Sequence, residues 1–444
     1  MYKASNLTFK GINRLAIPAI ISGIAEPLLS ITDTAIVGNI ELNSVESLAA
    51  VGIAGSFISA LVWILAQTRS AISAIVGRYL GAKKLDEIAT LPSQIIFINL
   101  IISIVLYFVS SYFATEIFKL YNAEGLILNY SVSYYKIRII GFPLTLFIFS
   151  VFGVFRGLQN TFWPMIISIV GVSINVVLDI ILVYGIDGYL EPMNISGAAW
   201  ASVISQGVMA LLALILLLKK TPFSLKLSLP FNKEIGNILS ISFNLIIRAI
   251  ALNVALFMAN AYATKYGDNF IAAQTIAFQI WLFFAFFIDG YSSVGNIVSG
   301  KLLGEKDYKS MWKLSIKLSK YTVIISIIMV ALCAVFYVPI GSLFSKDAFV
   351  LQSFYSVFWI VLLMQPINAI AFVFDGIFKG LAEAAILRNL LLIATFLGFV
   401  PALLIGDYFG LKLTGIWIAF TIWMLLRAGI LVVKFRKKYL TKNT

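Results

Sequence analysis

The residues of this chain that could do chemistry are acidic and amide side chains inside long apolar segments. Asp33 lies in the first such segment, and Asn175 and Asp179 lie together in the fifth. Residues four apart in an α-helix share a face, so Asn175 and Asp179 should point the same way. A charged side chain deep in a membrane is costly and by default functional. Because burial favours the neutral acid, such carboxyl groups can take up and release protons.

The first apolar segment carries a second acid and two prolines. Glu26 precedes Asp33 by seven residues, so a helix places both side chains on one face, about two turns apart. Pro27 lies between the two acids, and Pro18 lies nearer the N-terminus. A proline removes one backbone hydrogen bond and can bend a helix. We therefore predict hinges at Pro18 and Pro27.

Two further acids lie in the second half of the chain, each followed by a glycine. They are Asp289 in the eighth apolar segment and Asp375 in the tenth. Arg248 in the seventh segment could neutralise Asp289 or Glu26 and so join two helices. Gly380 is predicted to lie on the cytoplasmic side, and Asp375 precedes it by only five residues. The carboxylate of Asp375 could therefore instead be nearly solvated. The remaining bases inside apolar segments, which could pair or reach solvent with their long side chains, are Arg69, Lys136 and Arg138.

The composition argues against a soluble protein and against an enzyme. Of the 444 residues, 61% are hydrophobic and 12% are charged, whereas soluble domains carry about 25% charged residues. The chain has no histidine, which removes the commonest general base and metal ligand. Its single cysteine, Cys333, excludes an intrachain disulfide and a cysteine metal cluster. We expect an integral membrane protein without a cofactor, an enzymatic activity or a nucleic-acid partner.

Long apolar runs divide the chain into twelve predicted transmembrane helices. A helix needs about 20 apolar residues to cross a bilayer. The runs cover residues 13–37, 47–75, 92–113, 128–155, 161–185, 196–218, 236–263, 270–300, 314–338, 350–378, 385–406 and 413–433. Six of them precede the loop at 219–235 and six follow it. The predicted fold is an all-α integral membrane protein, with an N-lobe at 1–218 and a C-lobe at 236–444.

The basic residues between these runs predict the orientation of the chain. If the N-terminus is cytoplasmic, 25 Lys and Arg residues lie on the cytoplasmic side and 4 lie on the other side. The cytoplasmic count includes Lys379 and Arg427, near the ends of the tenth and twelfth runs. Basic residues collect on the cytoplasmic side of membrane proteins. We therefore expect a monomeric, multi-pass protein of the plasma (inner) membrane with both termini in the cytoplasm and the lipid bilayer around it.

The second half of the chain repeats the first at an offset of 223 residues. Residues 143–157 match residues 366–380, from a shared proline to a shared Phe-basic-Gly triplet. Residues 77–81 match residues 300–304, which begin and end with glycine. Secondary transporters are often built from two related halves. Because each half has an even number of spans, we predict a pseudo-twofold axis along the membrane normal.

Several short motifs occur in order along the chain. They are LAIP at 15–18, PLL at 27–29, DTAIVG at 33–38, NVVLD at 175–179, GAAWA at 197–201, Asp289-Gly290 and Asp375-Gly376. Together they resemble the motifs of the multidrug and toxic compound extrusion (MATE) transporters, most closely the branch that is similar to DinF, the DNA-damage-inducible transporter. The resemblance covers essentially the whole chain.

This resemblance implies a function for the acidic residues. It implies alternating access between two six-helix lobes, with export of small cationic or amphipathic drug-like substrates in exchange for H⁺ or Na⁺. Asp33, Asn175 and Asp179 fall where family members place the proton-coupling and substrate-facing cluster. An acid that serves the C-lobe cation site of norfloxacin exporters is replaced here by Asn368, which favours H⁺ as the coupling ion.

Two other classes of membrane protein remain as alternatives. A flippase for lipid-linked oligosaccharide or lipid has a related architecture, but it needs a large cavity rich in Arg and Lys to hold pyrophosphate. A channel would not need two related lobes with buried titratable acids. The predicted function is therefore a proton-coupled multidrug efflux antiporter, with the flippase as the alternative.

Overall fold

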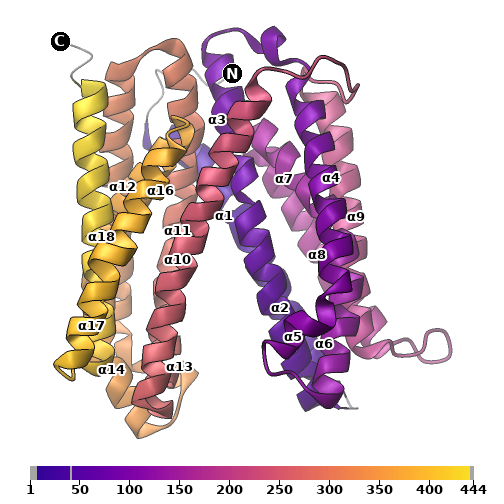
Figure 1. Ribbon diagram of the computed structural model, residues 1–444, viewed down its shortest axis with the longest axis vertical. Helices are drawn as coiled ribbons and strands as arrows, with labels where there is room; N and C mark the ends of the chain where they lie inside the picture. Colours follow the sequence, from indigo (N-terminus) through magenta and orange to yellow (C-terminus); the bar gives the residue numbers. More distant parts are fainter. Residues whose placement is uncertain (1–7, 41–42, 441–444) are drawn as a thin grey trace. The chain divides into compact units, whose positions relative to one another are not determined.

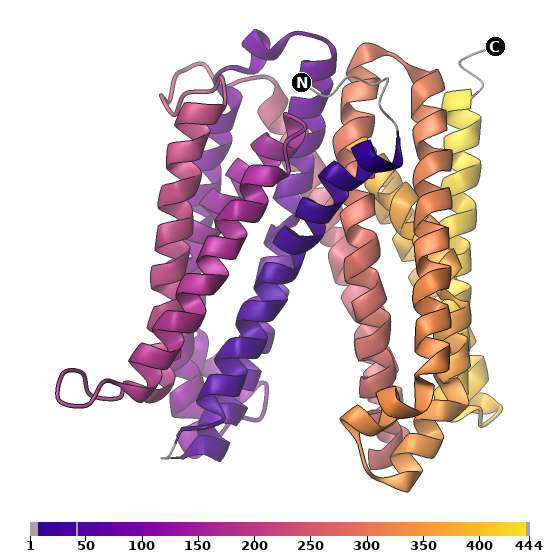
Figure 2. The ribbon, with the colours of Figure 1, turned by 180° about the vertical axis from the view of Figure 1, so that it is seen from behind.

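The described part of the chain is helical and carries enough apolar helices for a multi-pass membrane protein. The computed structural model describes residues 8–40 and 43–440, apart from the side chains of Glu26, Ser30 and Ile31. These residues contain no β-strand, and their one isolated bridge joins Ile186 and Leu190. Figures 1 and 2 show helices throughout. The predicted all-α membrane class is confirmed.

Within the described residues, eleven candidate spans are long and apolar enough to cross a membrane, and one bent pair of helices makes a twelfth. The helices of the eleven spans are α1 (Phe9–Val37), α2 and α3 (Ser44–Leu65 and Gln67–Gly81), α4 (Leu91–Tyr112), α6 and α7 (Gly125–Arg138 and Phe142–Gly157), α8 (Phe162–Tyr184), α9 (Asn194–Lys220), α10 (Glu234–Tyr266), α11 (Asp268–Glu305), α12 (Tyr308–Val335), α16 and α17 (Ala384–Ile393 and Val400–Tyr408) and α18 (Lys412–Phe435). The bent pair is α14 (Ala348–Leu363) and α15 (Gln365–Gly380), and the direction of the helix changes by 50° between them. The short helices α5 (Ala114–Lys119) and α13 (Tyr337–Phe344) precede α6 and α14.

The repeated prolines lie in the first turns of two equivalent helices, α7 and α15, and the second of them lies at a bend. Pro143 lies in the first turn of α7, after a short 3₁₀ turn at Ile139–Gly141. Pro366 lies in the first turn of α15, at the 50° bend. A proline fits the first turn of a helix because the N–H that it lacks would have no partner there. By contrast, α1 continues through Pro18 and Pro27 without a break, so hinges at these two prolines stay a prediction.

The chain forms two compact units that do not divide at a single point. The unit called here the N-unit contains Ile21–Val76 and Lys84–Leu239. Among the described residues, the C-unit contains the residues up to Ile20, Gly77–Lys83 and those from Ser240 onward. The predicted lobes followed the sequence repeat, whereas two short segments of the first repeat group with the C-unit. The joining segment at 219–235 groups with the N-unit.

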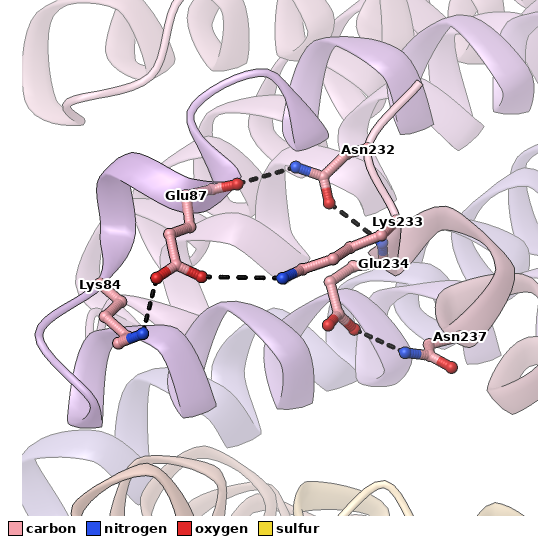
Figure 3. A network of polar contacts seen from close by, with 6 residues as sticks. All are labelled: Lys84, Glu87, Asn232, Lys233, Glu234 and Asn237. Atoms are coloured by element: carbon pink, nitrogen blue, oxygen red, sulfur yellow. Dashed lines mark hydrogen bonds and ion pairs between the residues drawn. The ribbon is translucent and has the colours of Figure 1, made fainter. Parts of the chain in front are cut away.

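That joining segment is held to the start of α4 by polar contacts. The buried amide of Gln94 donates from Nε2 to the carbonyl of Ser228 at 2.7 Å and accepts at Oε1 from the backbone N–H of Asn232 at 2.8 Å. Figure 3 shows the more exposed contacts beside it, which involve Lys84, Glu87, Asn232, Lys233, Glu234 and Asn237. Exposed ion pairs contribute little to stability, so the buried amide is the stronger attachment.

Glycines of the repeat allow close helix packing inside the N-unit. A Cβ atom at Gly157 of α7 would lie 2.6 Å from the Cβ of Val76 and 3.0 Å from the carbonyl oxygen of Ser73, both on α3. Because real Cβ atoms do not approach this closely, only glycine allows the present spacing of α3 and α7.

The C-unit repeats this packing with the equivalent residues. A Cβ atom at Gly380 of α15 would overlap the carbonyl oxygen of Asn296 and the hydroxyl of Ser299, both on α11. Gly380, Asn296 and Ser299 each lie 223 positions after Gly157, Ser73 and Val76. The register read from the sequence therefore matches the helix packing in the two units.

Two equivalent segments also meet inside the C-unit. A Cβ atom at Gly81 would overlap the carbonyl oxygen of Lys301, and a Cβ atom at Gly304 would overlap that of Arg78. Gly304 and Lys301 are the repeat equivalents of Gly81 and Arg78. A reciprocal contact of this kind is what a local twofold axis produces.

Replacing a packed glycine should destabilise the C-unit. A Cβ atom at Gly376 would overlap the backbone carbonyl of Ser292, so we expect Gly376→Ala to lower the free energy of unfolding by about 1–3 kcal/mol. The matched control is Gly429→Ala on α18, where a Cβ atom would meet open space. The control should be neutral or slightly stabilising, since alanine favours helix over glycine. Thermal unfolding in detergent measures both variants, and equal midpoints would refute the packing argument.

Candidate functional site

Asp33 lies buried among side chains from other helices of the N-unit, with only 1% of its surface exposed. The hydroxyl of Tyr134 on α6 donates a hydrogen bond to Oδ2 of Asp33 at 3.0 Å. The hydroxyl of Ser202 on α9 donates to the same oxygen at 3.1 Å. The second oxygen, Oδ1, makes no hydrogen bond within the described part of the chain. The two hydrogen bonds thus hold Oδ2 in position, while Oδ1 remains available to accept a hydrogen bond or a proton.

Asn175 and Asp179 on α8 join the same cluster, and both are fully buried. The Nδ2 of Asn175 donates to the hydroxyl of Ser202 at 3.2 Å. The carboxyl group of Asp179 lies close enough to that of Asp33 for the two to interact electrostatically. Neither oxygen of Asp179 is hydrogen-bonded among the described residues. The structure therefore brings together the three residues that the sequence placed on two separate segments.

A buried base accompanies these acids. Arg138, near the C-terminal end of α6, interacts electrostatically with Asp179 and with Tyr134. The sequence placed Lys136 beside it in the same apolar segment, but the side chain of Lys136 is exposed. One guanidinium against two carboxyl groups leaves an excess negative charge when both acids are ionised. A proton or a bound cation would compensate that charge.

An open pocket of about 300 Å³ lies beside α1 and α8 in the N-unit. Its lining is mostly apolar, with two serine hydroxyls, and consists of Ile21, Ile24, Ala25, Leu28, Ser168, Ile169, Val172 and Ser173. Along α8, Ser168 precedes Asn175 by seven residues, so both lie on one face, about two turns apart. A pocket of this size and polarity suits part of a small amphipathic molecule.

The C-unit contains a separate buried ion cluster around Asp375. This carboxylate is only 3% exposed. Its Oδ1 lies 2.7 Å from Nη2 of Arg248 and 3.9 Å from Nη2 of Arg427, and its Oδ2 lies 3.1 Å from Nζ of Lys379. The alternative that Asp375 is nearly solvated is therefore excluded. Its depth follows from Gly376 and Gly380, which let α15 pack closely on α11.

The partner predicted for Arg248 is also corrected by this cluster. Arg248 donates to Asp375 and not to Asp289, whose side chain is exposed on α11. The other predicted partner, Glu26, has a side chain outside the described part of the structure. Asn368 is buried on α15, but its Nδ2 donates to Oε1 of Gln365 at 3.0 Å, away from the ions around Asp375.

Sequence reasoning missed three members of these clusters. Tyr134 gave no signal beyond being one of two adjacent tyrosines. Ser202 directly follows the motif that begins at Gly197, where a Cβ atom would lie 2.5 Å from the carbonyl oxygen of Leu182. That close approach of α9 to α8 brings Ser202 within reach of Asn175. The motif that begins at Gly197 is therefore the sequence signal that could have identified Ser202. Arg427 was counted with the cytoplasmic bases, whereas it is almost fully buried on α18.

Comparison with protein families gives a match over both repeats. The family model described as MatE matches residues 18–181 and 245–404. The chain is 23% identical over 437 residues to DNA damage-inducible protein F of Escherichia coli K12, which covers 97% of this chain and 92% of that protein. It is 25% identical to Multidrug export protein MepA of Staphylococcus saprophyticus, which covers 96% of this chain and 92% of that protein.

A plant relative and two solved structures complete the comparison. Protein DETOXIFICATION 42 of Arabidopsis thaliana is 27% identical over 68% of this chain, and the match spans only 56% of that protein. A crystal structure of MATE in the bent conformation has a TM-score of 0.90 at 21% identity and covers 97% of this chain and 95% of that one. An outward-facing multidrug resistance MATE family transporter has a TM-score of 0.88 at 22% identity, with coverage of 98% and 97%. These two structures establish the similarity of fold.

Proposed function

Because the chain belongs to the MatE family, whose members are transporters and not enzymes, we propose that it is a proton-coupled efflux antiporter. It would export small cationic or amphipathic drug-like compounds across the plasma membrane by alternating access between its two halves. The bias of basic residues supports cytoplasmic placement of both termini. The relatives named as multidrug exporters support the class of substrate.

The observation that carries this proposal is the buried pair Asp33 and Asp179. Their carboxyl groups interact, and three of their four oxygens have no hydrogen bond among the described residues. These oxygens can accept either a proton or a positively charged ligand. The pair therefore has the chemistry that an exchanger of protons against cations needs.

The proposed cycle is a competition for this pair. Open to the outside, Asp33 and Asp179 take up protons, α1 bends or repacks, and the substrate leaves. Open to the inside, the acids lose their protons and attract a cation. Burial favours the neutral acids whereas a bound cation favours the ionised forms, so each ligand opposes the other. This difference supplies the differential binding that links the two conformations.

The flippase alternative has less support. Recognition of a pyrophosphate requires basic side chains on the wall of a large cavity. The pocket beside α1 and α8 has apolar and serine residues in its lining and no basic residue. The N-unit site carries an excess of acid, which suits a cation and not a pyrophosphate.

The proposal is tested with the purified chain in liposomes loaded with ethidium or norfloxacin. A pH gradient alone should drive transport, and a Na⁺ gradient alone at equal pH on both sides should not. Transport driven only by Na⁺ would replace H⁺ with Na⁺ as the coupling ion. If neither gradient drives ethidium or norfloxacin, and labelled lipid-linked oligosaccharide crosses the bilayer instead, the flippase is correct.

Removing the hydroxyl of Tyr134 should weaken transport without loss of the fold. Tyr134→Phe deletes one donor to Asp33, and a hydrogen bond to a charged group is worth about 1.5–3 kcal/mol. We expect the initial rate of pH-driven efflux to fall by about tenfold or more. The matched control is Tyr135→Phe, because the neighbouring ring packs against Phe57 and Phe118. Equal rates in the two variants would show that the contact with Asp33 has no role.

A further inference from the structure

Among the described residues, a group of three basic side chains in the C-unit has one acidic partner between them. Arg248, Lys379 and Arg427 come from α10, α15 and α18 and converge on Asp375. When all four groups are ionised, the cluster carries two excess positive charges. The two arginines and Asp375 are buried, and uncompensated charge is costly in an apolar interior. The cluster therefore attracts a further negative charge.

Arg427 is the member of the cluster with hydrogen-bonding capacity to spare. Its guanidinium carbon lies 4.7 Å from the ring centre of Trp423 and 5.6 Å from that of Phe372. These two rings hold the guanidinium in place. Its Nη1 donates only to the sulfur of Met424, a weak acceptor, at 3.1 Å. Its Nη2 has no hydrogen-bond partner within the described chain, although the side chain is only 2% exposed. That atom lies 3.9 Å from Oδ1 of Asp375.

Asp375 is already engaged by the other two bases. Its Oδ1 accepts from Arg248 at 2.7 Å and its Oδ2 lies 3.1 Å from Lys379. A third cation at 3.9 Å is beyond hydrogen-bond distance. Arg427 is thus held in the cluster by its aromatic neighbours and is only weakly paired. A planar guanidinium offers paired donors that match the oxygens of a phosphate or carboxylate.

We propose that Arg427, with Arg248 and Lys379, forms a binding site for the phosphate group of a small solute or of an anionic lipid. Lys379 is the more accessible edge of the site, since its side chain is 14% exposed whereas the arginines are nearly fully buried. It is also the next-to-last residue of α15, so the ligand enters at that end of the helix. This site is separate from the acids of the N-unit, and the inference does not depend on the transported substrate.

Direct binding of phosphate tests this inference. Purified, delipidated full-length chain in a neutral detergent is equilibrated with radiolabelled inorganic phosphate at constant ionic strength, set with sodium chloride. In parallel, short-chain phosphatidic acid is titrated. Short-chain phosphatidylcholine is the control, because its phosphodiester is neutralised by the choline cation and the lipid has no net charge. We expect saturable binding of one phosphate group per chain. Binding of inorganic phosphate identifies a soluble ligand, whereas binding of phosphatidic acid alone identifies a lipid headgroup.

Variants of the cluster decide whether these bases form the site. Arg427→Gln should weaken binding at least tenfold, and Lys379→Gln, at the accessible edge, should weaken it severalfold. Arg436→Gln is the matched control, because Arg436 is an exposed base just beyond the end of α18. If Arg427→Gln does not fold, the comparison of Lys379→Gln with Arg436→Gln decides alone. The inference is wrong if neither probe binds, or if the control loses as much affinity as the cluster variants.

Discussion

Replacing Asp33 by asparagine should abolish pH-driven efflux while the chain stays folded. The asparagine oxygen can still accept the hydrogen bonds that Tyr134 and Ser202 donate, so the side chain should keep its place. It cannot ionise, however, and so cannot exchange a proton for a cationic substrate. A carboxylate and a cationic group about 4 Å apart attract each other by about 4 kcal/mol at an effective dielectric constant near 20, and the asparagine variant loses this attraction. We therefore expect a loss of at least about a hundredfold in the initial rate of efflux.

The measurement is ethidium efflux from liposomes under an imposed pH gradient, combined with proton release on addition of substrate. Asp289→Asn is the matched control, since it removes an exposed acid from another apolar helix. The control should retain both signals. If Asp33→Asn releases protons as the unmodified chain does, Asp33 is not the coupling group. Asp179→Asn would then show whether Asp179 carries the proton alone.

Replacing Asp375 by asparagine should be among the most destabilising single changes in the C-unit. It removes the only acid within salt-bridge distance of Arg248 and Arg427 in the described structure, both of which are buried. Breaking a buried ion pair from one side costs about 3–5 kcal/mol, because the remaining charge stays in an apolar environment. We expect a correspondingly lower midpoint of thermal unfolding in detergent.

A second acid of the C-unit provides the comparison. Asp407 accepts from Lys265 at 2.9 Å and from the hydroxyl of Tyr266 at 2.9 Å, near the end of α17. Lys265 is largely exposed, so this pair is screened by solvent and contributes little. Asp407→Asn should therefore leave the midpoint almost unchanged. Equal midpoints for the Asp375 and Asp407 variants would mean that the buried cluster does not stabilise the fold.

The fold class could be predicted because its signals are local. Each apolar run is long enough to cross a bilayer, and such a run can satisfy its backbone only as a helix. The repeated prolines predicted equivalent positions in the two halves of the chain. Pro143 and Pro366 indeed both lie in the first turn of a helix. The bend between α14 and α15 was not predicted, because an apolar run does not show where its helix changes direction.

The candidate coupling site was predicted only in part. Asp33, Asn175 and Asp179 could be selected one helix at a time, because a carboxylate deep in an apolar run has few structural explanations. Their partners could not be selected in this way. Tyr134 and Ser202 are ordinary helix residues until α6 and α9 pack against α1 and α8 and bring their hydroxyls to Asp33.

The sequence by itself determined the apolar spans, their repeat and the acids that need a function, since these follow from composition and from spacing along one helix. The tertiary structure alone decided which charges meet. Arg248 and Asp375 lie 127 residues apart in the chain and 2.7 Å apart in space. A helical periodicity fixes the face on which a side chain lies, but the identity of the facing helix depends on how all the helices pack. For that reason Arg248 was assigned the wrong partner and Arg427 was placed among the loop bases.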